Sequence, residues 1–271
     1  MKTRIAIVLT GVLCLSLASA YAQFAPQSGG GMMRDAPHGP RLNASTAKLF
    51  GDNTAFSANL EMQTKGAGAE ETMTMPGKLA FDQGKSRFEM DMSQMKGAKM
   101  PPEAANQMKS MGMDKMIIIS LPAKQVSYLI YPGLQAYVEN PLQAKDAAEP
   151  AAEFKVEASE LGKETIDGHP CIKNKSVVTD KEGNKHEALV WNATDLKQFP
   201  IKIEQNEQGT AVTMLFKDID LSKPEASLFE PPTGFTKYDN MQAMMQQVMM
   251  KRMGGGMGGA LPLPRPPRTQ Q

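Results

Sequence analysis

The sequence is poor in the residues that build catalytic and metal sites. Its 271 residues include two cysteines, three histidines and one tryptophan, and aromatic residues make up only 6%. No phosphate loop, dinucleotide-binding glycine motif, zinc-protease motif, CxxC pair or nucleophile elbow occurs, and no spacing completes a zinc site around the histidines. The acidic residues are dispersed and do not single out a catalytic carboxylate pair. These absences predict a non-enzymatic protein without a cofactor.

An excess of charge of one sign is also missing. Lysine and arginine number 30 against 29 aspartate and glutamate, a formal net charge of +1. We therefore expect no nucleic-acid partner, because such binding relies on neutralising phosphates. The apolar stretch at residues 5–17 is shorter than the ~20 residues that span a bilayer. The sequence therefore predicts a protein that does not span the membrane.

That apolar stretch has the form of a secretory signal peptide covering residues 1–22. Lys2 and Arg4 precede it, and the tripeptide Ala-Tyr-Ala at 20–22 gives a small-x-small cleavage pattern. Leu13 stands before Cys14 where a lipoprotein signal needs a small residue, so there is no lipobox. The sequence predicts an exported protein, periplasmic or secreted.

Cleavage leaves a single cysteine, Cys171, which cannot form an internal disulfide. His169 lies two residues before it, and residues i and i+2 of a strand share one face. A catalytic thiol also needs a base and an orienting group, and the sequence shows no third group. We therefore favour a buried, structural Cys171, and a reactive thiol stays open.

Glycine and proline concentrate at both ends of the chain. Residues 23–45 predict a flexible arm, and residues 254–271, with the segment LPLPRPPR, predict a disordered tail of polyproline type. A proline-rich ligand for an envelope protein partner is the alternative for the tail. Residues 46–238 predict one domain, followed by a helix at 239–253 in which Asn240 caps the first turn.

Alternating polar and apolar residues dominate the domain and predict strands. The expected strands, joined by tight turns such as Asp-Gln-Gly-Lys at 82–85, lie at 56–62, 72–81, 87–92, 116–121, 126–131, 135–139, 154–161, 171–179, 186–191, 201–205 and 210–219. A helix is expected at 103–112. Successive strands with tight turns favour an antiparallel meander, so the fold class is mainly β with a few helices (α+β).

Methionine is abundant, with 22 residues. The second helix carries an apolar stripe at positions i, i+3, i+4, i+7 and i+8, and the first helix has a weaker version. Methionine adapts to irregular partners and is common on promiscuous binding surfaces. Packing on the sheet and lining of a ligand site both stay open for these residues: Met108, Met111, Met116, Met241, Met244, Met245, Val248 and Met249.

The same thioethers suggest an alternative function. Thioether sulfur is a soft ligand that suits Cu(I) and Ag(I). One set of candidate ligands is Met241, Met244, Met245 and Met249, and a second cluster comprises Met90, Met92, Met95 and Met100. The alternative is therefore a methionine-rich, copper- or silver-binding envelope protein.

Several motifs carry a family resemblance. They are ALVW at 188–191, FPIKI at 199–203, Gly209, FKDI at 216–219, LFEPPTGF at 228–235 and LGKETIDGHPC at 161–171. Together, over roughly residues 50–238, they resemble the periplasmic lipoprotein-carrier (LolA/LolB-like) superfamily. More closely, the chain looks like an exported domain-of-unknown-function family related to those carriers.

The resemblance implies an antiparallel sheet curved into a half-barrel, with helices in or over its concave face and a cavity for acyl chains. The missing lipobox, the methionine-rich helices and both tails depart from the carrier pattern, and no residue here matches the carrier's acyl-gating arginine. The expectation is therefore general: a soluble periplasmic binding protein or carrier for a hydrophobic small molecule, a lipid, an acyl chain or a lipoprotein. Contact with a membrane surface, and a protein-interaction or stress-sensing envelope domain, stay open.

Overall fold

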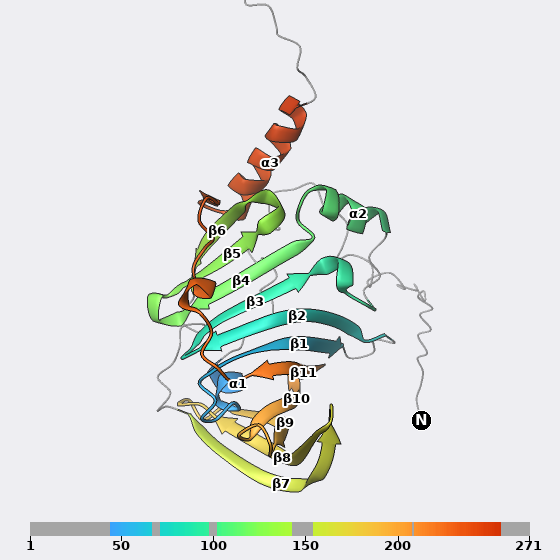
Figure 1. The fold of residues 1–271 in the computed structure, drawn as a ribbon, viewed down its shortest axis with the longest axis vertical. Helices are drawn as coiled ribbons and strands as arrows, with labels where there is room; N and C mark the ends of the chain where they lie inside the picture. Colours follow the sequence, from blue (N-terminus) through green and yellow to red (C-terminus); the bar gives the residue numbers. More distant parts are fainter. Residues whose placement is uncertain (1–43, 67–70, 98–101, 143–153, 208, 256–271) are drawn as a thin grey trace, which may run out of the picture. The chain divides into compact units, whose positions relative to one another are not determined.

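The computed structural model describes residues 44–66, 71–97, 102–142, 154–207 and 209–255. The predicted signal peptide, nearly all of the predicted arm and most of the predicted tail lie outside these residues. Twelve strands form one open, curved sheet in the order β12-β6-β5-β4-β3-β2-β1-β11-β10-β9-β8-β7 (Figure 1). The expected mainly β class with a few helices is confirmed.

Two meanders build the sheet. The first comprises β1 (Ala55–Lys65), β2 (Met73–Asp82), β3 (Lys85–Asp91), β4 (Lys115–Leu121), β5 (Val126–Tyr131) and β6 (Ala136–Pro141). The second comprises β7 (Lys155–Ile166), β8 (His169–Thr179), β9 (Lys185–Ala193), β10 (Phe199–Glu207) and β11 (Thr210–Asp220). The last strand of the second meander pairs with the first strand of the other, with Leu60 opposite Phe216. All eleven predicted strands are present, and the largest difference is at β7, which continues to Ile166.

Turn residues account for the tight hairpins. Gln83 and Gly84, between β2 and β3, have φ values of 49° and 87°, and Asp167 and Gly168, between β7 and β8, have 49° and 85°. Two successive residues with positive φ are the signature of the hairpin turn whose twist matches that of the strands. The predicted Asp-Gln-Gly-Lys turn is thereby confirmed.

One strand departs from the antiparallel expectation. β12 (Thr236–Tyr238) pairs with β6 in parallel, with Lys237 opposite Tyr137. The chain reaches it through the short helix η5 (Ala226–Phe229), which contacts β3 and β4 rather than forming a hairpin with a neighbour. A parallel pair needs such a crossover.

The inner face of the sheet, defined as the face that carries Phe56, Leu79 and Met90, holds the main core. Phe50, which follows helix α1 (Ala44–Lys48), lies among the rings of Phe56, Phe81, Phe199 and Phe216, at centroid distances from 4.7 to 6.2 Å. The rings of Phe56 and Phe199 are 4.9 Å apart although β11 separates their strands. Two strand spacings are about 10 Å, so the side chains converge and the sheet bends toward this face.

Residues of η5 cover one part of the outer face. Phe229 of η5 packs with Ile117, Ile119 and Ile130. The Lys85 ammonium lies 5.1 Å above the Phe229 ring and 2.6 Å from the buried carboxylate of Asp82. These contacts fasten the segment before β12 to the β2–β3 hairpin.

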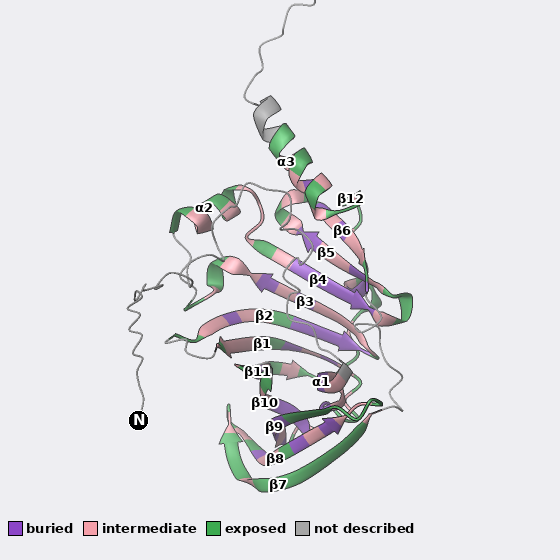
Figure 2. Cartoon of the chain, turned by 180° about the vertical axis from the view of Figure 1, so that it is seen from behind, coloured by how far each residue is buried: buried purple, intermediate pink, exposed green. Residues whose placement is uncertain are grey.

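The expected placement of the helices in or over the concave face is not confirmed. α2 (Pro102–Ser110) has no buried residue. α3 (Met241–Gly255) packs its first turns on the inner side of β6 and β12, and its remainder extends beyond the sheet (Figures 1 and 2). The predicted cap is confirmed, because the Asn240 side-chain oxygen accepts a hydrogen bond from the Ala243 amide at 2.8 Å. The short α1, which no pattern predicted, is the helix that contacts the second meander.

Candidate functional site

A band of methionines runs along the inner face from β1 to α3. Six partly buried side chains border the buried core clusters, and we call them the methionine surface: Met62, Met92, Met95, Met113, Met116 and Met241. Met116 and Leu129 each pack against two clusters, one centred on the phenylalanine rings and one formed by Tyr131, Val138 and Met244. The apolar inner face is therefore continuous from the second meander to the start of α3.

Strand register brings these methionines together. Met62 of β1 lies opposite Met75 of β2 on one side and Met214 of β11 on the other. Met90 of β3 lies opposite Met116 of β4. Opposite residues have their Cβ atoms about 5 Å apart, so the sheet arranges flexible, polarizable side chains as contiguous pairs. Met75, Met90 and Met214, the neighbours of Met62 and Met116 in these pairs, are buried.

The structure separates the residues that the sequence singled out. Met116, Met241 and Met244 meet in one cluster, with Met244 fully buried. Met245 and Val248 are half-buried, and Met249 is exposed. α3 is therefore anchored at its start, whereas Met249 and Met250, two turns later, are exposed. The residues of the expected apolar stripe therefore differ in burial and do not line one common surface.

The two candidates near α2 lie elsewhere. Met108 is half-buried on α2, and Met111 follows that helix. Neither belongs to the core clusters of the described residues. Sequence reasoning missed Met62 and Met113, whose role depends on distant packing partners. A usable signal was the spacing of two at Met73/Met75 and Met90/Met92, which places methionines on one strand face.

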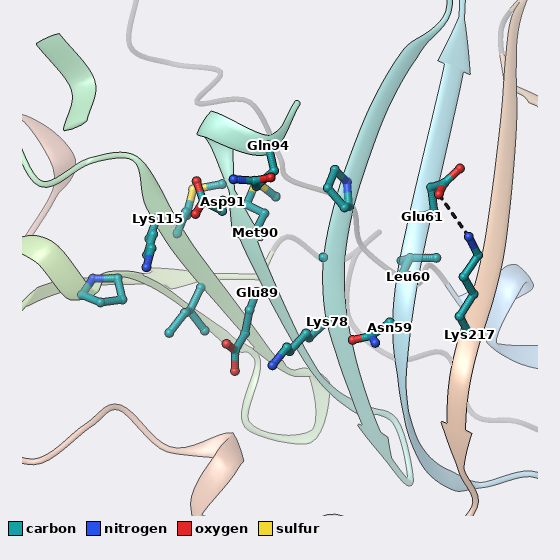
Figure 3. A pocket seen from close by; sticks show the side chains of 15 residues that line it. Asn59, Leu60, Glu61, Lys78, Glu89, Met90, Asp91, Gln94, Lys115 and Lys217 are labelled. Atoms are coloured by element: carbon teal, nitrogen blue, oxygen red, sulfur yellow. Dashed lines mark hydrogen bonds and ion pairs between the residues drawn. The ribbon is translucent and has the colours of Figure 1, made fainter. Parts of the chain in front are cut away.

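The outer face of the same strands carries a charged groove with a volume of about 520 Å³ (Figure 3). Three lysines and three acidic residues line it: Lys78, Lys115, Lys217, Glu61, Glu89 and Asp91. The Glu61 carboxylate lies 3.4 Å from the Lys217 ammonium. A hydrogen bond from Gln63 and the charge of Lys217 lower the pKa of Glu61. The charges balance, so the groove has no preference for a ligand of one sign.

The surroundings of the Cys171 thiol do not suit a catalytic nucleophile. The thiol is 2% exposed and donates to the backbone carbonyl of His169 at 3.3 Å, and burial raises its pKa. The His169 ring instead pairs with Asp195 at 2.8 Å. A buried thiol with a raised pKa carries little thiolate, which is the reactive form. The structure thus supports the structural role favoured for Cys171.

Within the ranges that the structure covers, no set of three histidine, cysteine, aspartate or glutamate side chains could hold a metal ion. In the same part of the chain, no helix is both long and apolar enough to cross a membrane.

A family model matches residues 56–199, which is more than half of the chain. The family is described as a domain of unknown function (DUF4412). The chain belongs to the DUF4412 family. The predicted membership of a family of unknown function is therefore confirmed. No curated protein matches this DUF4412 chain.

Three solved structures illustrate what this DUF4412 protein is similar to. A LolA superfamily protein from Nitrosomonas europaea is 11% identical, with 69% of this chain and 94% of that chain covered and a TM-score of 0.37. The lipoprotein LppX from Mycobacterium tuberculosis is 9% identical, with 65% and 94% covered and a TM-score of 0.37. MucB in its complex with MucA from Pseudomonas aeruginosa is 11% identical, with 69% and 59% covered and a TM-score of 0.34. These structures include the superfamily that the sequence motifs resemble, but at such scores they carry nothing about ligand or function.

Proposed function

We propose that this DUF4412 protein is a non-enzymatic carrier that holds a hydrophobic ligand, a lipid or an acyl chain, on its methionine surface. The observation that carries the proposal is the half-exposed state of Met62, Met92, Met95, Met113, Met116 and Met241 along one continuous apolar face. With the predicted signal peptide, the carrier is expected to work in the periplasm or outside the cell.

The energetics favour an apolar ligand on this face. Covering apolar surface stabilises a complex by roughly 25 cal/mol per Å², or about 0.8 kcal/mol for each CH₂ group buried. Methionine side chains adjust to different shapes, so the surface suits flexible chains rather than one rigid molecule. The groove on the opposite face also has apolar lining, but six ionisable side chains border it, so an acyl chain there would lie against charged groups.

The part of the inner face that protein side chains leave open determines where the ligand would lie. Phe50 and its neighbouring rings occupy the middle of the inner face. An acyl chain would therefore lie toward β3, β4 and β5, beside Met92, Met95 and Met116. Met241, in the first turn of α3, forms the boundary on the side of β6.

Binding of a fluorescent fatty acid to delipidated protein tests the proposal. Replacing two half-buried methionines together, Met95→Gln and Met116→Gln, should weaken binding at least about 10-fold, because each loses apolar contact equivalent to several CH₂ groups. Leu161→Gln is the matched control, since Leu161 is exposed on the edge strand β7, away from the inner face. Equal affinity of the double variant and the control, with both folded by circular dichroism, would rule out this site.

Soft-metal binding is a second candidate, and one observation favours it. Met90, Met92 and Met95, which the sequence predicts as a thioether cluster, all belong to the large core cluster of the inner face, as do Met62 and Met116. The fourth predicted member, Met100, lies outside the described residues. An anaerobic Cu(I) titration against a competing chelator tests this candidate. Unchanged competition after replacing Met92 and Met95 by leucine, which keeps the apolar volume but removes the sulfur, would dismiss it.

A further inference from the structure

Sulfur atoms of the described residues differ widely in their access to solvent. The methionines of the methionine surface are half-buried, and Met249 and Met250 of α3 are 57% and 61% exposed. The Cys171 thiol, the single thiol in the same part of the chain, is 2% exposed. Four other methionines are only 0–8% exposed: Met75, Met90, Met214 and Met244. A reagent in solution that attacks sulfur therefore reaches the methionine surface, Met249 and Met250 before it reaches the thiol or these four buried methionines.

Three thioethers of the methionine surface lie at one end of β3 and β4. Met92 begins the short helix η1 (Met92–Gln94), and Met95 follows its last residue. The Met92 amide donates to the Asp114 carbonyl at 2.7 Å, just before β4, and η1 contacts β4. Met92, Met95 and Met116 of β4 all pack against the core cluster of the inner face. They form the part of the surface beside which the acyl chain is expected to lie.

Methionine gives these positions a property that leucine would lack. Leucine and methionine have similar volumes and exchange in cores at small cost, so leucine could supply a similar apolar surface. The thioether, in addition, takes up an oxygen atom and becomes a polar sulfoxide. The side chains of the core cluster are hydrocarbons and thioethers, among them Leu60, Phe88 and Ile118. A sulfoxide oxygen covered by a ligand would lose water without gaining a hydrogen-bond donor from this cluster, which is unfavourable.

We propose that the methionine surface is an oxidation site for hypochlorous acid, at which conversion of Met92, Met95 and Met116 to sulfoxides releases the apolar ligand. The release rests on the proposed carrier function, whereas the oxidation does not. Hypochlorous acid is a small, neutral two-electron oxidant, so it can approach a sulfur atom that lies between apolar side chains. Its target here is the half-buried thioether, because the thiol is shielded.

The oxidation proceeds in two steps at each sulfur atom. A lone pair of the sulfur attacks chlorine, and the Cl–O bond breaks with departure of hydroxide. Water then displaces chloride from the sulfur and loses two protons, one of which neutralises the hydroxide. The thioether is thereby oxidised by two electrons to a sulfoxide, the chlorine is reduced to chloride, and one proton is released.

The change is reversible and spares the core. Methionine sulfoxide reductases return the sulfoxide to the thioether. The four buried methionines are 0–8% exposed, so the sheet stays folded while its surface changes polarity. Cys171, whose higher oxidation states cannot be reversed in this way, is 2% exposed and is spared as well.

Limited oxidation of the delipidated chain from residue 23 onward tests the inference. Peptide mapping by mass spectrometry after a small dose of hypochlorous acid should show sulfoxides at Met92, Met95 and Met116 before the buried methionines react. The treated protein should bind a fluorescent fatty acid at least about 10-fold more weakly, because sulfoxide oxygens without hydrogen-bond donors would contact the chain. Treatment with methionine sulfoxide reductases should restore the affinity.

Leucine variants separate these three sulfur atoms from the others. M92L/M95L/M116L keeps the apolar volume without the sulfur, so it should bind the fatty acid and keep its affinity after the same dose. M249L/M250L removes the exposed thioethers of α3 and should lose affinity as the unchanged protein does. Full affinity of the treated unchanged protein would overturn the inference, as would an equal loss in M92L/M95L/M116L or equally fast oxidation of the buried methionines.

A failure of the carrier proposal would be recognised separately. If the untreated protein binds no fatty acid, the carrier proposal is wrong, and urea unfolding then tests the oxidation site. Sulfoxides at packed positions lose apolar contact with the core cluster. Treatment should therefore lower the unfolding midpoint of the unchanged protein and not that of M92L/M95L/M116L. An equal shift in the two proteins, or no shift in either, would overturn the oxidation site as well.

Discussion

Phe50 is the residue on which the inner face most depends, and Phe50→Ala tests that role. Its ring is 1% exposed and contacts the rings of Phe56, Phe81, Phe199 and Phe216, which come from both meanders. Removing it leaves a cavity at the centre of these four rings, since the surrounding strands hold their positions by hydrogen bonds and cannot collapse fully.

The expected cost is large relative to the stability of a domain. Phenylalanine-to-alanine changes in cores cost about 3–5 kcal/mol. Aromatic pairs contribute a further ~0.5–1.5 kcal/mol each beyond area, which puts Phe50→Ala near the upper end, about 4–5 kcal/mol. Domains are stable by about 5–15 kcal/mol. Phe50→Leu keeps most of the volume and should cost roughly 1.5 kcal/mol or less.

Urea unfolding followed by two probes measures this effect. Circular dichroism reports the whole sheet, and fluorescence of the single tryptophan, Trp191, buried on β9, reports the second meander. Both midpoints should fall together in Phe50→Ala, because the ring joins the two meanders. Phe235→Ala, at a half-buried ring of the outer face, is the control and should cost about 1–2 kcal/mol. A loss below about 1 kcal/mol for Phe50→Ala would refute the role of α1 and Phe50 as part of the core.

Further predictions concern a tightly packed glycine, a hydrogen-bonded carboxylate and the thiol. Gly77→Ala should destabilise by roughly 1–3 kcal/mol in urea unfolding, because the added Cβ would lie 2.6 Å from the Phe88 ring; an unchanged midpoint would contradict this. The indole N–H of Trp191 lowers the pKa of Glu164. That contact therefore stabilises the fold above the ordinary glutamate pKa and is lost as the pH falls through the lowered value, so Glu164→Gln should flatten the acid side of the stability profile. Cys171 should react with Ellman's reagent only as fast as the protein opens, because burial raises the pKa of its thiol; rapid reaction in the native state would show an accessible thiolate.

The strands and turns were predictable because their signals are local. The alternation from Phe56 to Met62 predicts a half-buried strand, and Asp82 to Lys85 supplies a turn, without reference to distant residues. Asn240 likewise predicts its own cap, and the structure has that hydrogen bond. The parallel pairing of β12 with β6 could not be predicted, because it depends on where η5 packs on the outer face.

The candidate site was predictable only in part. Met116, Met241 and Met244 were named and do meet, whereas Met249, on the same predicted stripe, lies in solvent. An apolar stripe predicts which residues of a helix lie on one side. It does not predict how many turns of the helix pack on the sheet. Here β6 and β12 support only the first turns of α3, because they form the edge of the sheet.

By itself, the sequence determined the strand order along the chain, the hairpin turns and the motifs of a family of unknown function, since each depends on neighbouring residues. Only the tertiary structure decided that Met62 lies between Met75 and Met214, that Phe50 fills the inner face, and that α3 extends beyond the sheet. These facts follow from strand register and from packing between residues more than a hundred positions apart. A register shift of one residue would turn every methionine of a strand to the opposite face, so the binding surface exists only once the sheet has formed.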